Sequence, residues 1–342
     1  MSRVKGDDLE IGALKRPEGV DEGAVVSIFR VPPELAGMRL DLFLHGELKR
    51  SSRTRAQFII RNSAFDARGR RMKPSDRLKS EQHVFLWRPP WDETPVPTDL
   101  PVIYEDDDLL VLSKPALLPV HPTARYHKNT VIVVLKASRP GEWLSLGHRL
   151  DRETSGLLMI TKNPECDRRL KKMLEERGDI KKVYLAIIHG APWPVGHVFR
   201  CDKSLAFDTE SKLGVKVMVS DAKEAWASGT VFEVIGVTTG TEKYSKLLCT
   251  LESGRQHQIR VHLASYGTPI VGDKLYGPDD MLFARGADGE LTAEDELILE
   301  LPRHALHAYR LGLPHPITGE PLELTAPLPK DLDDFWESKL RA

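Results

Sequence analysis

Cysteine is scarce in this chain of 342 residues, which contains only Cys166, Cys201 and Cys249. The three lie far apart, are odd in number and form no CxxC pair, which argues against a disulfide framework and against a cysteine zinc site. The same pattern suits a reducing cytoplasm. The histidines do not form the HExxH pair of a zinc enzyme either, so we expect neither a metal nor a cofactor.

Long hydrophobic runs are also missing. No apolar stretch approaches the roughly 20 residues of a membrane-spanning helix, and the N-terminus has no signal-peptide core, so we expect a cytoplasmic protein without a membrane partner. A phosphate-binding loop and a dinucleotide fingerprint are absent from the sequence. What remains is an ordinary globular composition, 41% hydrophobic and 29% charged, long enough for two domains and without a sign of an obligatory protein partner.

The net charge of −1 conceals an uneven distribution. Between residues 49 and 79, eleven basic residues are opposed only by Asp66 and Asp76, which gives +9 over 31 residues and leaves −10 for the remainder. Charge segregated in this way is typical of a nucleic-acid-binding module attached to a near-neutral body. A solvated basic face without a partner has the same pattern, so charge alone leaves both interpretations open.

Composition divides the chain into four parts. Residues 1–24 are polar and aperiodic and predict a flexible tail. Residues 25–88 predict a compact module, residues 89–99 a proline-rich linker, and residues 100–342 the main domain. Within that domain, an acid- and glycine-rich stretch at about 279–297 predicts an exposed inserted loop.

Apolar periodicity predicts the elements of both folded parts. In the module we expect a helix beginning at Arg39 with an apolar face, a second helix over 52–61, and a closing strand from His83 to Trp87. In the main domain, residues 102–112 predict a strand, an acidic turn and a second strand. Further expected elements are a strand over Leu157–Thr161, a helix capped by Asn163 and Pro164, strands over Lys181–Ile188 and Lys246–Leu251, and a helix that opens after Gly254 and ends at Gly267.

The most informative stretch is His148-Arg149-Leu150-Asp151-Arg152-Glu153-Thr154-Ser155-Gly156. A close arginine lowers the pKa of an aspartate by roughly 1–3 units, so two flanking guanidiniums predict an ionised Asp151 that serves as a nucleophile or base. Gly156 permits a tight turn, and Thr154 and Ser155 can hydrogen-bond the loop's own amides. By charge pattern alone, a surface ion-pair cluster is the alternative.

The whole nine-residue string resembles the signature of the RluA family of pseudouridine synthases, in which the aspartate of HRLD is catalytic. Four other blocks resemble further family motifs; they lie at residues 104–115, 182–186 (K-x-Y-x-A), 254–262 (GR-x-HQIR-x-H) and 303–308. The pattern G-x-RLD-x-FL, then SR-x-x-A-x-x-II, at residues 37–60 resembles the alpha-L, ribosomal-protein-like RNA-binding module that precedes many such domains. Residues 62–69 depart from the family's usual turn.

The resemblance implies roles for individual residues. Asp151 attacks or deprotonates the sugar, Tyr184 stacks on the target base and can help remove the proton at carbon 5, and Arg260 holds Asp151 ionised. By helical spacing, Gln256 and Arg260 share one face at i and i+4. Candidates for substrate contact are His148, Arg149, Arg152, Thr154, Arg255, Gln256, His257 and Leu306 in the main domain and Arg53 and Arg55 in the module, with Lys114 and His121 as weaker ones.

The implied fold is α+β: a mixed, mainly antiparallel sheet with flanking helices around a central RNA cleft, plus the small N-terminal α/β RNA-binding module. The expected partner is RNA, large-subunit ribosomal RNA before transfer RNA. One rival is a non-catalytic RNA-binding or ribosome-assembly factor on the same scaffold, against which the intact set of Asp151, Tyr184 and Arg260 weighs. The other is a hydrolase that uses Asp151, for which no GxSxG motif or acid pair is present.

Overall fold

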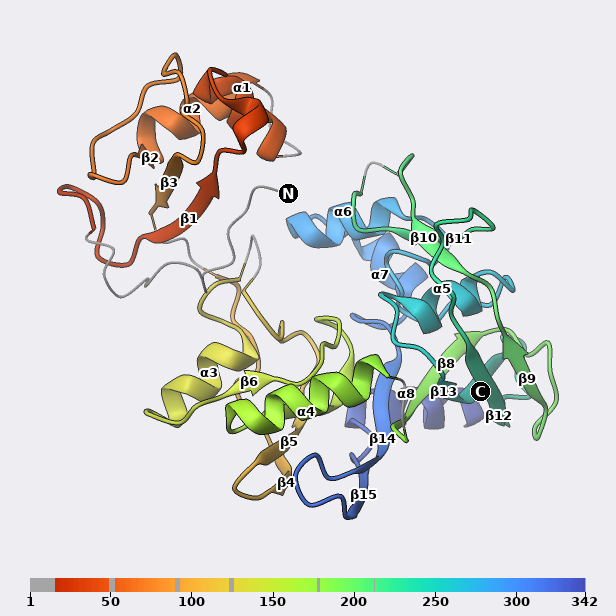
Figure 1. Cartoon of the computed structure of the whole chain (residues 1–342). Coiled ribbons are helices and arrows are strands. Elements are labelled where there is room, and N and C mark those ends of the chain that lie inside the picture. The colour runs from red at the N-terminus through yellow and green to blue at the C-terminus, as the bar shows by residue number, and fades with distance from the viewer. Residues whose placement is uncertain are drawn as a thin grey trace. The chain divides into compact units, whose positions relative to one another are not determined.

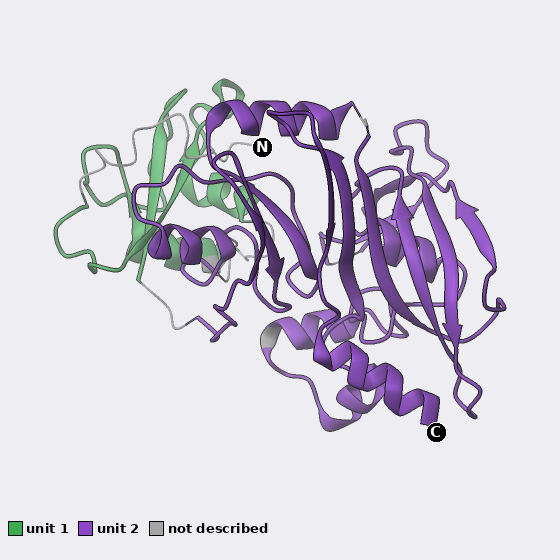
Figure 2. Cartoon of the chain, turned by 90° about the horizontal axis from the view of Figure 1, so that it is seen from below, with its two compact units in different colours: residues 1–92 green, residues 93–342 purple. Residues whose placement is uncertain are grey.

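The computed structural model describes residues 16–48, 53–89, 93–122, 126–176, 179–211 and 213–341. The chain divides after Asp92 into two compact units, unit 1 (residues 1–92) and unit 2 (residues 93–342), and this division falls within the predicted linker (Figure 2). Most of the predicted tail, and the basic residues Lys49 and Arg50, lie outside the described residues. Within the described ranges, no helix is long and apolar enough to span a membrane.

Unit 1 is a three-stranded antiparallel sheet packed against two helices, with strand order β1-β3-β2. The apolar face predicted for the first helix is buried, with Leu40 and Leu44 fully enclosed and Phe43 2% exposed. The predicted helices and closing strand are confirmed. The elements are β1 (Val25–Arg30), the 3-10 turn η2 (Pro33–Leu35), α1 (Leu40–Glu47), α2 (Arg53–Ser63), β2 (Ala64–Phe65) and β3 (His83–Arg88).

Unit 2 is built on a ten-stranded sheet in which β7 and β14 form the parallel pair and the other described pairs are antiparallel. The strand order is β4-β5-β7-β14-β8-β13-β12-β9, with β15 beside β14 and β6 beside β7. A separate hairpin, β10 (Leu205–Phe207) and β11 (Val217–Val219), stands outside this sheet. The strands are β4 (Val102–Glu105), β5 (Leu109–Lys114), β6 (Ser145–Leu146), β7 (Ser155–Thr161), β8 (Lys181–His189), β9 (Val198–Cys201), β12 (Thr230–Val237), β13 (Tyr244–Leu251), β14 (Leu306–Pro314) and β15 (Pro321–Thr325).

Helices flank this sheet, which confirms the expected α+β class (Figure 1). The helix predicted after Asn163 is α4, and the Asn163 side chain caps it by accepting a hydrogen bond from the Cys166 amide at 2.9 Å. Leu170 of α4 packs on one cluster of buried strand residues, and Leu263 of α5 and Phe335 of α8 belong to another. The helices are α3 (Val131–Ser138), α4 (Pro164–Glu175), α5 (Gln258–Ala264), α6 (Met281–Asp288), α7 (Ala293–Leu299) and α8 (Lys330–Arg341).

The stretch 279–297 is exposed at many positions, as its composition predicted, but it is not a loop, because α6 and most of α7 occupy it. Thr292 and Asp295 form a reciprocal cap at the start of α7, with N···O distances of 3.2 and 3.0 Å. Arg285 of α6 donates two hydrogen bonds to Asp295, at 2.8 and 2.7 Å, and so joins the two helices. The acidic residues favour the first turn of a helix, where they meet its positive end, and composition alone did not show this.

Gly156 fixes the exit of the HRLD loop (residues 148–154) into β7. Its φ is +106°, a region that side-chain-bearing residues rarely adopt, and a Cβ atom there would lie 2.2 Å from the Ala308 carbonyl oxygen. The backbone of β7 therefore approaches β14 where His307 pairs with Ser155 and Ala308 with Gly156. This contact sets the loop directly against the centre of the sheet.

Candidate active site

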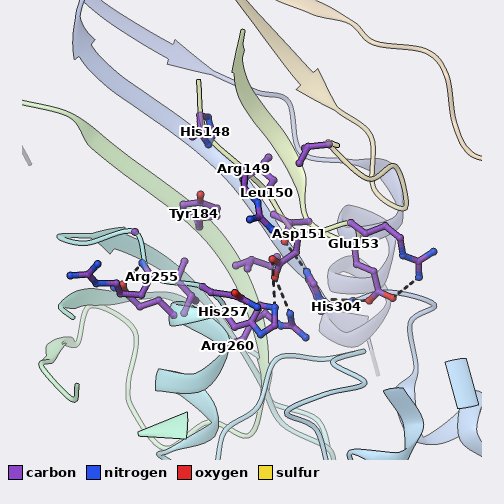
Figure 3. A pocket seen from close by; sticks show the side chains of 18 of the residues that line it. His148, Arg149, Leu150, Asp151, Glu153, Tyr184, Arg255, His257, Arg260 and His304 are labelled. Carbon is purple, nitrogen blue, oxygen red and sulfur yellow. Dashed lines mark hydrogen bonds and ion pairs between the residues drawn. The ribbon is translucent and has the colours of Figure 1, made fainter. Parts of the chain in front are cut away.

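A pocket of about 700 Å³ in unit 2 gathers residues from the predicted motifs (Figure 3). The sheet brings them together, because β14 lies between β7, which follows the HRLD loop, and β8, which carries Tyr184. The start of α5 closes another side. The lining includes residues 119–121, 146–154, 182, 184, 251, 254–260, 274, 283, 304 and 306.

Asp151 faces this pocket with 31% of its side chain exposed. Its Oδ2 atom accepts a hydrogen bond from Nη1 of Arg260 at 2.9 Å, and its Oδ1 atom lies 3.8 Å from Nε2 of His257 (Figure 3). Arg260 therefore fixes one carboxylate oxygen, while Oδ1 has no hydrogen-bond donor among the described residues. The arrangement holds the carboxylate in place and leaves one oxygen for a bound molecule.

A second carboxylate holds Arg260 from the opposite side. Asp273 accepts hydrogen bonds from Nε and Nη2 of Arg260 at 2.6 and 2.8 Å, and its Oδ1 also accepts from the amides of Leu275 and Tyr276 at 2.9 and 3.0 Å. Asp273 is 1% exposed and Arg260 is 6% exposed. The guanidinium also lies 5.0 Å from the centre of the Tyr276 ring. Arg260 is thus fully positioned before any substrate binds.

The charges around Asp151 keep it ionised. Burial raises the pKa of Asp151, but Arg260 and His257, which is protonated in the acid range where Asp151 titrates, outweigh burial and lower this pKa to about 2. Burial lowers the pKa of His257 to about 4, so this imidazole is neutral at neutral pH and Arg260 is the permanent cation beside the carboxylate. Asp151 is therefore a carboxylate at neutral pH, suited to act as a nucleophile or base.

The two arginines that flank Asp151 in the sequence do not hold it, contrary to the prediction from the motif. A turn closed by the Thr154 amide and the Asp151 carbonyl, at 3.2 Å, directs Arg152 elsewhere. Arg152 donates to the Tyr126 hydroxyl at 3.1 Å and to Glu153 at 3.2 Å. Arg149 is exposed at the pocket. Charge adjacency in the sequence did not give adjacency in space, and Arg260, 109 residues away, supplies the charge.

Two buried lysines support the HRLD loop by hydrogen bonds to its residues. Lys274 donates to Glu153 at 2.9 Å and to the Pro302 carbonyl at 2.6 Å. Lys114, proposed from the sequence as an RNA contact, is 1% exposed and donates to carbonyl oxygens that include Arg152 at 3.2 Å. Burial and the nearby Arg303 lower the pKa of Lys114 to about 7. Lys114 is therefore a support for the loop and not a contact for RNA.

Three other motif residues are engaged inside the protein. The Nε2 atom of His148 accepts a hydrogen bond from the Met159 amide at 3.2 Å, and burial lowers its pKa to about 3. The hydroxyl of Thr154 is buried and bonds His304 at 2.8 Å, while Ser155 bonds His307 at 3.0 Å. The prediction that these hydroxyls bond the loop's own amides is therefore wrong. The two hydroxyls tie the loop to His304, which precedes β14, and to His307 within β14.

Tyr184 and Leu306 lie where the sequence placed them, lining the pocket while mostly buried, at 8% and 5% exposure. Figure 3 shows Tyr184 across the pocket from Arg260. Among the described residues, the Tyr184 hydroxyl has no hydrogen-bond partner. The burial of both residues leaves only their pocket-facing surfaces available to a ligand.

The start of α5 differs from its prediction. The helix begins at Gln258, and His257 before it has a left-handed backbone with φ of 57°. Gln256 therefore does not share a helical face with Arg260, and its side chain donates to the Val215 carbonyl at 3.4 Å. Arg255 is exposed and donates to the Ala227 carbonyl at 3.3 Å. Both still line the pocket.

In unit 1, Arg53 is held by an internal carboxylate. Asp41 is fully buried and accepts hydrogen bonds from Arg39 at 3.0 Å, from Arg53 at 3.1 Å and from Gln57 at 2.8 Å. The hydrogen bond from Arg39 is the strongest influence that keeps the pKa of Asp41 well below its usual range. The side chain of Arg55 lies outside the described part of the chain.

One cluster in the described residues has the composition of a metal site: Asp106, Asp108 and His315. The Nδ1 atom of His315 accepts hydrogen bonds from the Ile317 and Thr318 amides at 3.3 and 3.1 Å, so the ring proton lies on Nε2, 3.0 Å from Asp106. Asp108 accepts from Asn163 at 2.6 Å. A metal ion would need the lone pair that Nε2 lacks, so these residues do not fit a metal.

Sequence reasoning missed Asp273, Tyr276 and the pairing of Lys274 with Glu153. The available signal was the cluster Gly272-Asp273-Lys274-Leu275-Tyr276-Gly277, a turn-forming stretch with charged residues inside it. Gly272 has φ of +75°, and a Cβ atom there would lie 2.1 Å from the Arg303 carbonyl oxygen. A tight turn at such a glycine places Asp273 within hydrogen-bonding distance of Arg260.

Comparison with known proteins identifies this arrangement. Residues 108–265 match the family model for RNA pseudouridylate synthase. "Ribosomal large subunit pseudouridine synthase D" of Neisseria meningitidis serogroup A is 33% identical over 310 residues, covering 88% of this chain and 79% of the relative. The protein of the same name from Xanthomonas campestris pv. campestris is 34% identical over 309 residues, covering 88% and 89%.

Solved structures share the fold. "Human RNA Pseudouridylate Synthase Domain Containing 1" superposes with a TM-score of 0.54 at 23% identity, covering 73% of this chain and 98% of that chain. "Human RNA Pseudouridylate Synthase Domain Containing 4" gives 0.52 at 25% identity, covering 70% and 92%. The resemblance seen in the sequence is thereby confirmed over the non-catalytic alternative: the chain belongs to the RluA-type RNA pseudouridine synthases, isomerases that convert uridine in RNA to pseudouridine.

Proposed function

We propose that this enzyme modifies uridines of large-subunit ribosomal RNA in the cytoplasm, and that Asp151 performs the chemistry. The relatives whose names specify that substrate align with 88% of this chain. The observation that carries the role of Asp151 is its ionised carboxylate in the pocket, with Oδ2 fixed by Arg260 at 2.9 Å and Oδ1 without a donor among the described residues. Transfer RNA is the alternative substrate class.

The reaction breaks the bond between C1′ and N1 of a uridine, turns the uracil and rejoins it through C5, from which a proton is lost. The target base must first leave the RNA stack, which costs a few kcal/mol and is cheapest in loops. The carboxylate of Asp151 either bonds to C1′ as N1 departs or removes the proton from C2′. Both routes need an ionised, fixed carboxylate, which the Arg260 ion pair provides.

Tyr184 serves as the stacking surface for the uracil in this proposal, with Leu306 beside it. Burial and the nearby Asp151 raise the pKa of Tyr184, so its hydroxyl keeps its proton at neutral pH. A protonated phenol does not remove the C5 proton, and we therefore assign its ring to stacking. The pocket of about 700 Å³ lies within the size range of small-ligand sites.

Unit 1 supplies affinity through phosphate contacts in the same proposal. A hollow of about 530 Å³ is lined in part by Arg61, Arg71 and Lys73, all exposed and basic. Arg53 is excluded from this set because Asp41 already neutralises part of its charge. Basic side chains in such a hollow bind the RNA backbone with strong salt dependence and little base specificity.

Tritium release from RNA labelled at C5 of uridine tests the substrate class. Unmodified large-subunit ribosomal RNA and transfer RNA are incubated separately with the wild-type enzyme. Release from the ribosomal RNA and none from transfer RNA is the expected result. Release from transfer RNA alone would overturn the proposed substrate, and release from neither RNA nor from immature large-subunit particles would overturn the proposed activity.

A further inference from the structure

The gap between Asp151 and His257 has the dimensions of a binding site for one hydroxyl group. Oδ1 of Asp151 and Nε2 of His257 lie 3.8 Å apart, which is too far for a direct hydrogen bond. An oxygen atom between them can lie about 2.8 Å from both, which is the usual length of a hydrogen bond. Both residues line the pocket, and Figure 3 shows them facing each other.

His257 is held rigidly on its side of this gap. It is the residue immediately before α5, and its backbone is left-handed, with φ of 57°. Its Nδ1 atom lies 2.8 Å from the Tyr276 hydroxyl, and that hydroxyl oxygen accepts a hydrogen bond from the Val217 amide at 2.9 Å. The imidazole is therefore fixed by its backbone and by one ring nitrogen, which leaves Nε2 to face the pocket.

The hydrogen bonds of Tyr276 also decide where His257 carries its proton. With Val217 donating to the phenolic oxygen, the phenolic proton is directed at Nδ1 of His257, which acts as an acceptor. A neutral imidazole that accepts at Nδ1 carries its proton at Nε2. The opposite tautomer would set a lone pair of Nε2 against the Asp151 carboxylate. The gap thus has a donor, the His257 N–H, on one side and an acceptor, Oδ1, on the other.

We propose that His257 and Asp151 together bind the 2′-hydroxyl of the target nucleotide, with His257 donating to its oxygen and its proton pointing to Oδ1. The proposal rests on the function proposed above. Within an RNA chain the 3′ and 5′ oxygens are esterified, so the 2′-hydroxyl is the free hydroxyl of an internal nucleotide. It is carried by C2′, next to C1′, so either catalytic route brings it beside the same carboxylate. His257 then distinguishes ribose from deoxyribose at the reacting nucleotide.

Equilibrium binding of paired RNAs to the full-length enzyme tests this contact. The probe is the RNA segment that the tritium assay shows to be modified, synthesised with pseudouridine already at the target so that no turnover occurs. One version carries ribose at that nucleotide and the other 2′-deoxyribose. In the wild type the deoxy version should bind roughly tenfold more weakly, as expected for a hydrogen bond to a charged group.

His257→Asn is the test variant, because asparagine tolerates the left-handed backbone and removes the imidazole. The ratio of the two Kd values should fall at least threefold from wild type to His257→Asn. A smaller fall would overturn the proposal. His197→Asn, which changes an exposed histidine outside the pocket, should leave the ratio at its wild-type value.

Tyr276→Phe provides a second variant that keeps the ring beside Arg260 and removes the hydroxyl that orients His257. If His257→Asn fails to fold, as judged by circular dichroism, the ratio must fall in Tyr276→Phe, and an unchanged ratio there overturns the proposal. The same wild-type preparation is assayed for tritium release. Absence of release rejects the proposed function, whereas release with an unchanged binding ratio rejects only the role of His257.

Discussion

Replacing Asp273 by asparagine tests whether Arg260 is positioned by the carboxylate behind it. Asp273 makes two charged hydrogen bonds to Arg260, at 2.6 and 2.8 Å, and an amide can accept only one of them while its NH₂ group opposes the guanidinium. Breaking a buried ion pair costs about 3–5 kcal/mol of stability. For a domain the size of unit 2 this lowers Tm by about 10 °C. A displaced Arg260 shifts Asp151, and a misplacement of about 1 Å lowers kcat roughly a hundredfold.

The assay is single-turnover tritium release with enzyme in excess, run well below the Tm of the variant, alongside Kd for the same RNA. Because Asp273 is buried, at 1% exposure, Kd should stay within about threefold. Asp295→Asn is the matched control, since Asp295 is also buried and holds an arginine, Arg285, by hydrogen bonds of 2.8 and 2.7 Å. The control should lose stability and keep its rate. A rate for Asp273→Asn near the wild-type value, or equal losses in rate and binding, would refute the positioning role.

Three further outcomes are expected. In Arg260→Gln the permanent charge beside Asp151 is lost while its burial remains, so the pKa of Asp151 should rise from about 2. As the pH falls from 8 to 4.5, the rate of the variant should therefore decline at a higher pH than the rate of the wild type. An unchanged pH profile would count against the ion pair. Deleting residues 1–92 should weaken RNA binding and lower the slope of log Kd against log salt concentration by about 0.7–0.9 for each lost phosphate contact. A slope equal to that of the full-length enzyme would exclude phosphate binding by unit 1. Gly156→Ala should cost about 3 kcal/mol in thermal unfolding, because its Cβ would lie 2.2 Å from the Ala308 oxygen at a φ of +106°, and a wild-type Tm would contradict this.

Periodic elements were predictable from the sequence because burial selects their spacing. The capped start of α4 at Asn163 and the buried strand after the HRLD loop were both confirmed. Composition without periodicity was a poor guide at 279–297, where acidic residues belong to helix starts. The charge of a segment shows neither whether the segment forms a helix nor in which direction its side chains point.

Site residues that belong to a family motif were predictable from the sequence. Residues that only the fold brings next to them were less predictable. Asp151 and Arg260 came from motifs, and the structure brings them within 2.9 Å. Asp273 lies in a turn whose sequence does not show which of the chain's acids lies beneath Arg260. Arg152 illustrates the converse error, because a single turn directs a sequence neighbour of Asp151 toward Tyr126 instead. A local charge pattern does not show how the backbone turns, and the turn decides which side chains face each other.

The most direct test of the role of Asp151 is tritium release by Asp151→Ala beside the wild type, with the Kd for the same RNA measured on both. If Asp151 performs the chemistry from a site that the rest of the protein organises, release should disappear while Kd rises by no more than roughly tenfold, which is the share of binding assigned to the 2′-hydroxyl contact. Release that persists in the variant would contradict the catalytic assignment. Loss of release together with an equal loss of binding would show that Asp151 supports the structure of the pocket and does not perform the reaction.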